Sequence, residues 1–271
     1  MADRFDLTTV EAALCGTKFS GHVRHFPSLG STNTFALDAA QVGAADGCVY
    51  VADEQTSGRG RGRHGWHSAT GDGLYVSVLL RPKMAIADAL WMSLATGLAA
   101  QTAICAATGL KPDIRWPNDL LIGDKKCGGV LVETSVAAAT EGVPAALRYA
   151  VIGVGINVNH KSFPPELDGI ATSLRRESGR RCERERLVVE VLLALDDEME
   201  LLQAELAGKS GAGLLERFGA ASSWVRGRRV RVEESGGYTG VTDGLDTRGF
   251  LRVDGDDGVL HTVLSGGVRA V

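Results

Sequence analysis

The chain has 271 residues, of which 44% are hydrophobic and 23% are charged, and its formal net charge is −4. A chain of this length and composition can bury a substantial core, which excludes an intrinsically disordered protein. The slight negative charge argues against a surface that attracts nucleic acid as a whole, so any anion-binding site must be local.

The first part of the chain predicts short elements that lead into one unusual loop. The opening residues lack a basic segment followed by an apolar one, so no secretory signal is indicated. Residues 8–15 predict a short helix and residues 22–26 an extended segment. Ser31, Thr32 or Asn33 then offers a helix N-cap. Residues 47–55 predict a buried strand that runs directly into the loop.

The loop is GRGRGRHGW, residues 58–66, in which three glycines alternate with three arginines. Glycines let backbone N–H groups turn toward a ligand, while Arg59, Arg61 and Arg63 supply positive charge. This composition favours a loop that binds phosphate or carboxylate and orders around it. A solvated hairpin tip and an RGG-like contact to nucleic acid are the alternatives.

Residues 73–82 predict a second strand, which ends at Pro82, and residues 86–109 predict a long apolar helix. The most apolar stretch, residues 89–110, contains four polar side chains: Ser93, Thr96, Gln101 and Thr102. A buried helix explains this pattern better than a membrane span does. We therefore expect a cytoplasmic protein that does not enter a membrane.

A second candidate site is RWPNDLLIGDKKCGG, residues 115–129, which follows a short strand predicted at residues 113–116. Pro117 sets a tight corner that places Asn118 and Asp119 at the start of the next segment. A lysine and an aspartate at such a corner can stabilise a phosphoryl group and orient an attacking amine. A salt bridge across a turn is the structural alternative.

Residues 125–136 and 149–159 predict two strands with little polar alternation, which is typical of strands buried on both faces. Gly153 and Gly155 interrupt the second of them, in GVGINVN. Glycines within a strand mark either a bulge or a place where something lies flat on the sheet.

The last third of the chain changes character at Trp224. Residues 183–206 predict an amphipathic surface helix. From Trp224 onward, short β-branched runs separated by Gly and Asp predict a small all-β domain of about five strands. We therefore expect two domains, residues 1–223 and 224–271. The five cysteines are odd in number and form no CxxC pair, so we expect reduced thiols and neither disulfides nor a zinc site.

Taken together, STN, QTSGRGR, RWPNDLLIGDKKCGGVLVE and GVGINVN, followed by a small β-domain, resemble the biotin protein ligases, also called biotin–[acetyl-CoA carboxylase] ligases. The resemblance extends from about Ser28 to Val271. It implies an α+β fold: a mixed sheet flanked by helices, of the class II synthetase-like type, with a small C-terminal SH3-like β-barrel.

The resemblance also implies an enzyme that works in two steps. Biotin and ATP, with Mg²⁺ bound to the ATP and no protein cage for a metal, give biotinyl-5′-AMP and pyrophosphate. A lysine of the biotin carboxyl carrier protein, from acetyl-CoA carboxylase or a related carboxylase, then takes the biotin as an amide. Activation is needed because a carboxylate is a poor electrophile, whereas the mixed anhydride has a good leaving group.

Matching positions carry the family's site residues onto this sequence. The implied catalytic residues are Lys126, Arg61 and Asp119, with Asp119 positioning the acceptor lysine. The implied biotin-binding residues are Ser31, Thr32, Asn33, Gln55, Arg59, Gly60, Arg61, Lys126, Gly129, Gly153 and Gly155, the last three leaving room for the valeryl chain. The implied ATP- and adenylate-binding residues are Arg59, Arg61, Asn118, Lys126, Asn157 and Trp66, although Trp66 could equally be a core residue.

The sequence departs from the family pattern in two places. The loop reads GRGRGRHGW rather than GRGRxGRxW, so Arg63 and His64 have no clear counterpart. Cys127 stands where the family commonly has an apolar residue, and a buried hydrophobic side chain is the simplest interpretation. About thirty residues precede STN, too few for a helix-turn-helix domain, so we expect a monofunctional ligase that does not bind DNA. A homodimer is compatible with the pattern.

Two alternatives remain open at this point. A lipoate or octanoate ligase shares the catalytic fold but usually lacks the GRGR loop and the small barrel. An RNA-binding module would use the Gly/Arg loop and the basic residues of the tail, Arg226, Arg228, Arg229 and Arg231. Seven acidic residues in the same tail make its charge two-sided.

Overall fold

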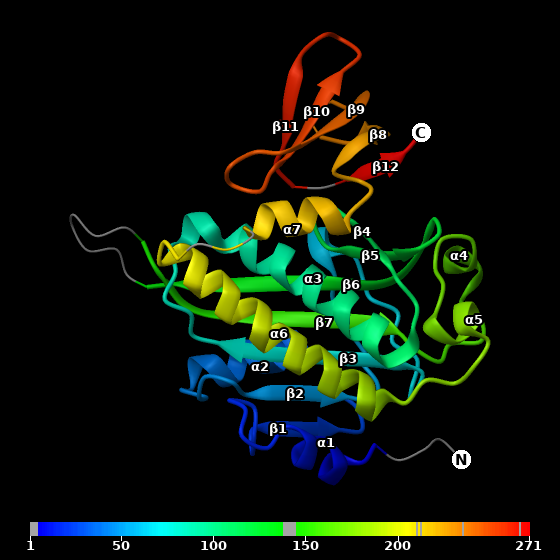
Figure 1. The fold of residues 1–271 in the computed structure, drawn as a ribbon. Helices are drawn as coiled ribbons and strands as arrows, with labels where there is room; N and C mark the ends of the chain where they lie inside the picture. The colour runs from blue at the N-terminus through cyan, green and yellow to red at the C-terminus, as the bar shows by residue number, and fades with distance from the viewer. Residues whose placement is uncertain (1–4, 138–144, 210, 212, 235, 266) are drawn as a thin grey trace.

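The computed structural model describes residues 5–137, 145–209, 211, 213–234, 236–265 and 267–271. They form two β-sheets, a large one covered by helices and a small one placed over one of its edges (Figure 1).

The large sheet has seven strands: β1 (Val23–Phe26), β2 (Val49–Ala52), β3 (Gly73–Leu80), β4 (Asp113–Arg115), β5 (Asp119–Ile122), β6 (Lys125–Val136) and β7 (Leu147–Asn157). Their order is β1-β2-β3-β7-β6-β5-β4. Only β1 and β2 pair in parallel, and the other neighbours are antiparallel. The expected mixed sheet is therefore confirmed.

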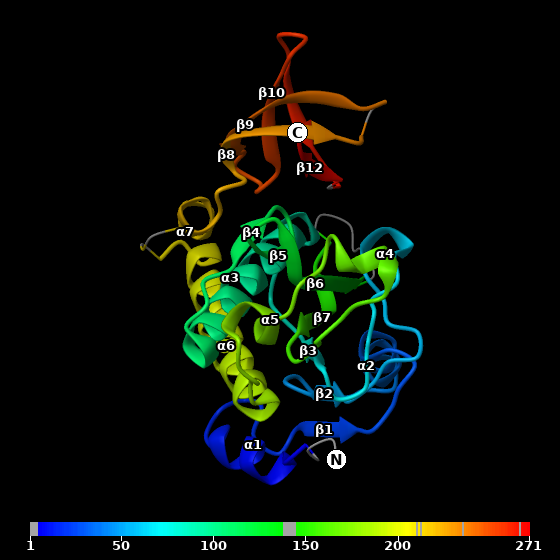
Figure 2. The same ribbon diagram turned by 90° about the vertical axis from the view of Figure 1, so that its right-hand side faces the viewer.

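Helices cover both faces of this sheet. They are α1 (Leu7–Ala13), α2 (Thr32–Gln41), α3 (Ala89–Thr108), α4 (Pro165–Asp168), α5 (Leu174–Ser178), α6 (Arg184–Leu206) and α7 (Leu214–Ala221). The long helices α3 and α6 pack together on one face, and α2 packs on the other against β2, β3 and β7 (Figure 2). The helices α2, α3 and α6 thereby bury apolar residues against the sheet or against another helix.

Strand β3 shows why the sheet is buried on both sides. Every second side chain of β3 lies in the core under α3 and α6, namely Leu74, Val76, Val78 and Leu80. Leu79 lies on the opposite face and packs with α2. The same alternation places Tyr75 and Ser77 on the α2 side. That side of β3 forms one wall of the site described below.

The local signals for helix ends hold in the structure. Ser31 is the N-cap of α2, where its hydroxyl accepts a hydrogen bond from the Thr34 amide. Helix α3 ends at Gly109, which adopts φ 78°. The segment Ile86–Thr108 is long and apolar enough to cross a membrane by length and composition, yet it packs against α6 and the sheet, so the prediction of a buried helix is confirmed.

The small sheet contains β8 (Arg226–Val232), β9 (Tyr238–Leu245), β10 (Leu251–Gly255), β11 (Leu260–Val263) and β12 (Val268–Ala270). All neighbours are antiparallel, in the order β11-β10-β9-β8-β12, which agrees with the five strands expected for the SH3-like part. Two indoles of the large domain hold it: Trp91 donates to the Arg248 carbonyl (3.0 Å) and Trp116 to the Gly249 carbonyl (2.9 Å).

The sequence analysis missed four short elements: β5, α4, α5 and α7. The longest of them, α7, has eight residues, and segments this short carry too few apolar repeats to show a clear period. Strand β5 matters most, because it lies beside β6 and carries Asp119 at its first position.

Candidate active site

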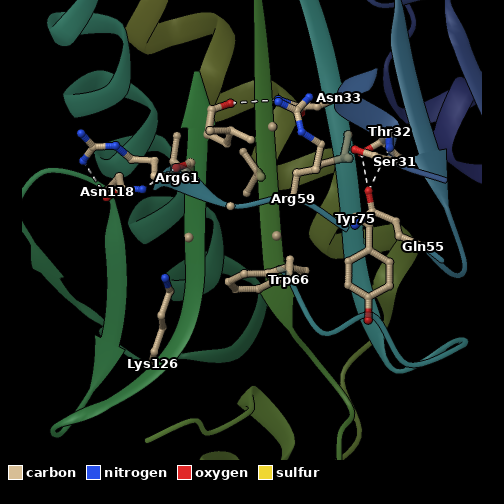
Figure 3. A pocket seen from close by; sticks show the side chains of 18 residues that line it. Ser31, Thr32, Asn33, Gln55, Arg59, Arg61, Trp66, Tyr75, Asn118 and Lys126 are labelled. Carbon is tan, nitrogen blue, oxygen red and sulfur yellow. Dashed lines mark hydrogen bonds between the residues drawn. The ribbon is translucent and has the colours of Figure 1, made fainter. Parts of the chain in front are cut away.

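Two connected pockets open on the side of the sheet that faces α2. The first is lined from α2, β3, β6, β7 and the Gly/Arg loop, as Figure 3 shows, and the second extends from it toward the small sheet. Both are lined by the same five residues at their junction: Gly60, Arg61, Trp66, Asn118 and Lys126. All of these residues except Gly60 have side chains that can contact a polar or charged ligand.

The Gly/Arg loop folds as a tight β-hairpin. The Trp66 amide donates to the Gly58 carbonyl (2.9 Å), and the Gly60 amide to the His64 carbonyl (2.8 Å). A short 3-10 turn over Arg61–Arg63 closes the hairpin, with Gly62 at φ 61°. The Gly60 and Trp66 amides are thus used within the loop, and Arg59, Arg61 and Trp66 line the first pocket. The Arg63 side chain lies outside the described part of the structure.

At the closed end of the first pocket, Thr32 and Gln55 bind each other. The Thr32 amide donates to Gln55 Oε1 (2.9 Å), and the Thr32 hydroxyl lies 3.1 Å from the same oxygen. Gln55 Nε2 donates to the Ser68 hydroxyl (3.1 Å). Ser31 also lines the pocket and is buried. The predicted STN segment and Gln55 thus meet, although Gln55 lies 23 positions after Thr32 in the sequence.

Asn33 lines the same pocket but its side chain is committed to protein partners. Its amide donates to Glu133 Oε2 (3.0 Å) and to the Leu131 carbonyl (3.3 Å), and its Oδ1 accepts from Ser77 (2.6 Å). A Cβ placed on Gly153 would lie 2.1 Å from this Oδ1. Gly153 therefore makes room for Asn33, and the open space that the sequence predicted over this glycine is filled.

Trp66 occupies the corresponding place over Gly155. A Cβ on Gly155 would lie 2.7 Å from the indole ring, so any larger residue there would require the ring to shift. The Lys126 ammonium lies 5.3 Å from the centre of the same ring, and a Cβ on Gly129 would lie 3.2 Å from the Lys126 side chain. Gly129, Gly153 and Gly155 all line the first pocket, but they let protein side chains approach the sheet.

Arg59 crosses the rim of the first pocket and binds Glu133 with both terminal nitrogens. The distances are 2.6 Å from Nη2 to Oε1 and 3.1 Å from Nη1 to Oε2. This two-pronged geometry fixes the plane of the guanidinium group.

Arg61 lies at the junction of the two pockets. Its Nη1 is 3.4 Å from Asn118 Oδ1, and Asn118 is itself held by a 2.6 Å hydrogen bond from Nδ2 to the Val130 carbonyl. Burial lowers the pKa of the Arg61 guanidinium, while the nearby Asp119 and Glu234 carboxylates act to raise it. An arginine remains protonated in spite of such a shift, so a fixed positive charge stands at the junction.

Asp119 lies between two cations. Arg115 Nη2 is 2.5 Å from its Oδ2, and the Lys126 ammonium forms an ion pair with its Oδ1. Burial alone would raise the pKa of Asp119, but the charges of Lys126 and Arg115 outweigh it and hold the pKa below its usual value. The carboxylate is therefore ionised at neutral pH.

The second pocket joins parts of the chain that the sequence analysis did not connect. Its apolar wall comes from the segment around α4, through Phe163, Leu167, Ile170 and Ala171, and its far side from Glu233, Ser265, Gly267, Val268 and Arg269 of the small-sheet domain. Neither group has a local signal, because ordinary apolar and loop residues look alike wherever they lie. Other missed residues do lie in visible motifs, such as Arg115, Trp116 and Pro117 in RWPND.

The structure also locates three further residues that the sequence analysis discussed: Asn157, His64 and Cys127. Asn157 and His64 line the second pocket. The Asn157 amide donates to the carbonyls of Thr172 (3.1 Å) and Lys126 (3.4 Å), which steadies the backbone at Lys126. Cys127 is fully buried, and burial raises the pKa of its thiol to about 12, so the interpretation as a small buried apolar residue is confirmed.

Several arginines of the small sheet form ion pairs, whereas Arg226 and Arg231, which the RNA-binding alternative also uses, are exposed. Arg229 binds Asp256 (2.6 Å) and Arg252 binds Asp243 (2.6 Å). Arg228 reaches Asp124 of the large domain at 3.3 Å. Such pairing offsets part of the positive charge that an RNA-binding surface would need.

Comparison with protein families gives two matches. A profile of the Biotin/lipoate A/B protein ligase family matches residues 25–157. These residues include the Gly/Arg loop and the segment RWPNDLLIGDKKCGG. A profile of the Biotin protein ligase C terminal domain matches residues 226–268, the small sheet.

Curated relatives with similar sequences carry related names. The chain is 34% identical over 232 residues to the biotin–[acetyl-CoA-carboxylase] ligase of Mycobacterium tuberculosis, covering 83% of this chain and 80% of the relative. It is 33% identical over 241 residues to the bifunctional ligase/repressor BirA of Bacillus spizizenii, covering 88% of this chain and 71% of the relative.

Among solved structures, the biotin protein ligase from Aquifex aeolicus in complex with biotin and ATP aligns with a TM-score of 0.75 and 26% identity. The alignment covers 92% of this chain and 99% of that chain, so both sheets are included.

Proposed function

This chain belongs to the biotin protein ligase family, and from that premise we propose that it joins biotin to a lysine of a carrier protein in two steps, both at the junction of its two pockets. The observation that carries the proposal is the junction itself. One pocket offers polar groups suited to a neutral ring, the other is large enough to extend to the small sheet, and Arg61 and Lys126 stand where they meet.

In the proposed first step, the first pocket holds biotin. The ureido ring is neutral, so it needs hydroxyl, amide and backbone groups rather than charges. Ser31, Thr32 and Gln55 supply such groups at the closed end, and Asn33 acts by holding the wall in place. Arg59 stands over the pocket and binds the carboxylate of the acid.

The second pocket holds ATP with its α-phosphorus at the junction. A carboxylate oxygen of biotin attacks the α-phosphorus, the bond to the β-phosphate oxygen breaks, and pyrophosphate leaves. Negative charge grows on the phosphoryl oxygens during this step, and the charges of Arg61 and Lys126 stabilise it. Asn118 orients Arg61, and Phe163 with its apolar neighbours offers a surface for the base.

Mg²⁺ arrives with ATP in this proposal. Mg²⁺ is usually bound through substrate phosphates and one or two carboxylates, with several waters retained. The junction suits this mode, because the Asp119 carboxylate there already binds two cations.

In the proposed second step, the amine of the acceptor lysine attacks the carbonyl carbon of biotinyl-5′-AMP. An amide bond forms, the bond to the phosphate oxygen breaks, AMP leaves, and the amine loses one proton. The ionised Asp119 attracts and orients the incoming amine. The names of the relatives support the carrier domain of acetyl-CoA carboxylase, or of a related carboxylase, as the acceptor.

The choice of biotin over lipoate rests on the second profile match. Residues 226–268 match the C-terminal domain of the biotin protein ligases, and this domain lines the far side of the second pocket.

ATP–pyrophosphate exchange tests the proposal. Purified protein with Mg²⁺ and ATP should exchange pyrophosphate when biotin is added and remain silent with lipoate or octanoate. Exchange with lipoate alone would reassign the chain to the lipoate ligases, and a silent reaction with every acid would refute the adenylation step.

A further inference from the structure

We infer that Glu133 is a positioning residue of the first pocket, because its carboxylate holds Arg59 and Asn33 together across the rim. The inference rests on the proposed function, in which Arg59 binds the carboxylate of biotin. It gives a role to Glu133, the last residue of RWPNDLLIGDKKCGGVLVE, to which the sequence analysis assigned none.

The Glu133 carboxylate accepts three hydrogen bonds from two side chains. Arg59 donates to Oε1 (2.6 Å) and Oε2 (3.1 Å), and the Asn33 amide donates to Oε2 (3.0 Å). Both oxygens are used, so the guanidinium group cannot rotate without losing a charge-assisted hydrogen bond. The carboxylate thereby sets the direction in which Arg59 offers its remaining donors.

The position of Glu133 on β6 explains how it reaches both partners. Gly129, Leu131 and Glu133 alternate along one face of the strand. Gly129 and Leu131 line the first pocket, whereas Glu133 lines neither pocket. It therefore acts on the ligand through Arg59 and Asn33 rather than by contact.

From Asn33, further hydrogen bonds continue into the buried interior. Asn33 Oδ1 accepts from Ser77 (2.6 Å), and Ser77 Oγ lies 2.8 Å from the Thr32 hydroxyl. Thr32 binds Gln55, and Gln55 binds Ser68, which follows the Gly/Arg loop. Ser77 is fully buried, so these groups depend on one another for partners.

The chain of contacts joins the two ends of the loop. Arg59 lies near the start of the loop and Ser68 just beyond its end. The hydrogen bonds that link these two residues run through Glu133, Ser77 and residues that line the first pocket. An ion pair that is partly exposed contributes little to stability in water, so what Glu133 supplies is geometry.

The variant Glu133→Gln tests this role. An amide has one acceptor oxygen where the carboxylate has two, so Arg59 or Asn33 loses its partner. We expect the KM for biotin in pyrophosphate exchange to rise about ten-fold, the size expected for one charge-assisted hydrogen bond, while kcat changes much less. A merely structural role would lower the melting temperature without this split.

A double-mutant cycle with Arg59→Gln separates action through Arg59 from a general effect. If Glu133 works through that arginine, adding E133Q to R59Q should raise the KM little further. The matched control is Glu198→Gln, which breaks a comparable ion pair with Arg217 far from both pockets and should leave the KM unchanged.

Calorimetric titration with biotin alone supplies a readout that does not depend on catalysis. Unchanged biotin affinity in E133Q would overturn the role of Glu133, and full additivity with R59Q would overturn its action through Arg59. A wild-type protein that binds biotin but catalyses no exchange would instead refute the proposed function.

Discussion

The ammonium of Lys126 and the carboxylate of Asp119 form an ion pair at the point where the two pockets meet. The pair brings together the two charges that the proposed reaction uses in turn, a cation for the phosphoryl oxygens and an anion for the incoming amine. Each can therefore be tested by removing its charge.

Lys126→Ala should reduce biotin-dependent pyrophosphate exchange by a factor on the order of 100 to 1000, the usual loss when one group that stabilises developing charge is removed. The matched control is Lys125→Ala, since the neighbouring lysine starts the same strand but lines neither pocket. Exchange near the wild-type rate in K126A would remove Lys126 from the reaction.

Asp119→Asn should slow transfer more than adenylation. The substitution keeps the shape and removes the charge that orients the amine, so transfer from purified biotinyl-5′-AMP to a carrier domain should fall on the order of 100-fold. Pyrophosphate exchange, measured on the same preparation, should fall less. Equal losses in both assays would indicate that Asp119 acts only by holding Lys126.

Gly155→Ala should weaken biotin binding on the order of ten-fold, because the new methyl group meets the Trp66 ring at 2.7 Å and forces it into the pocket. Titration with biotin measures the effect. Gly219→Ala is the control, since a Cβ there meets nothing within 4 Å. Wild-type affinity in G155A would mean that the indole can move away from the ligand.

His160 should make the folded protein less stable in mild acid. Its ring is buried against Phe163, and burial lowers its pKa from 6.5 to about 4. Between these values the unfolded chain binds a proton that the folded chain does not, so stability falls as the pH decreases through this window. The loss attributable to His160 is about 2 kcal/mol at pH 5.

Urea unfolding at pH 7.5 and pH 5 measures this loss. His160→Gln should flatten the difference between the two pH values, whereas His261→Gln, on the surface of the small sheet, should not. Equal pH dependence in wild type and H160Q would show that another group controls acid stability.

Cys127 should resist alkylation in the folded protein, because its thiol is buried and its pKa is raised to about 12. Cys15 and Cys105 are exposed and should react with iodoacetamide at pH 8. Site-resolved mass spectrometry of the native protein measures all three. Labelling of Cys127 at the rate of Cys15 would contradict the burial.

The sequence by itself determined the elements and the motifs. Alternating and helical apolar patterns located the longer strands and helices, because hydrophobic periodicity is local. The composition of GRGRGRHGW and RWPNDLLIGDKK pointed to charged residues there, and the resemblance of these motifs to the biotin protein ligases singled out Arg61, Lys126 and Asp119. The structure places all three around the junction of the pockets.

Only the tertiary structure decided which distant residues meet. Arg59 and Glu133 are 74 residues apart, and they touch because the strand order places β7 and then β6 beside β3. The same holds for Trp66 over Gly155, and for Glu233 and Arg269 at the second pocket. Strand order and register result from packing the whole chain, and no local pattern encodes them.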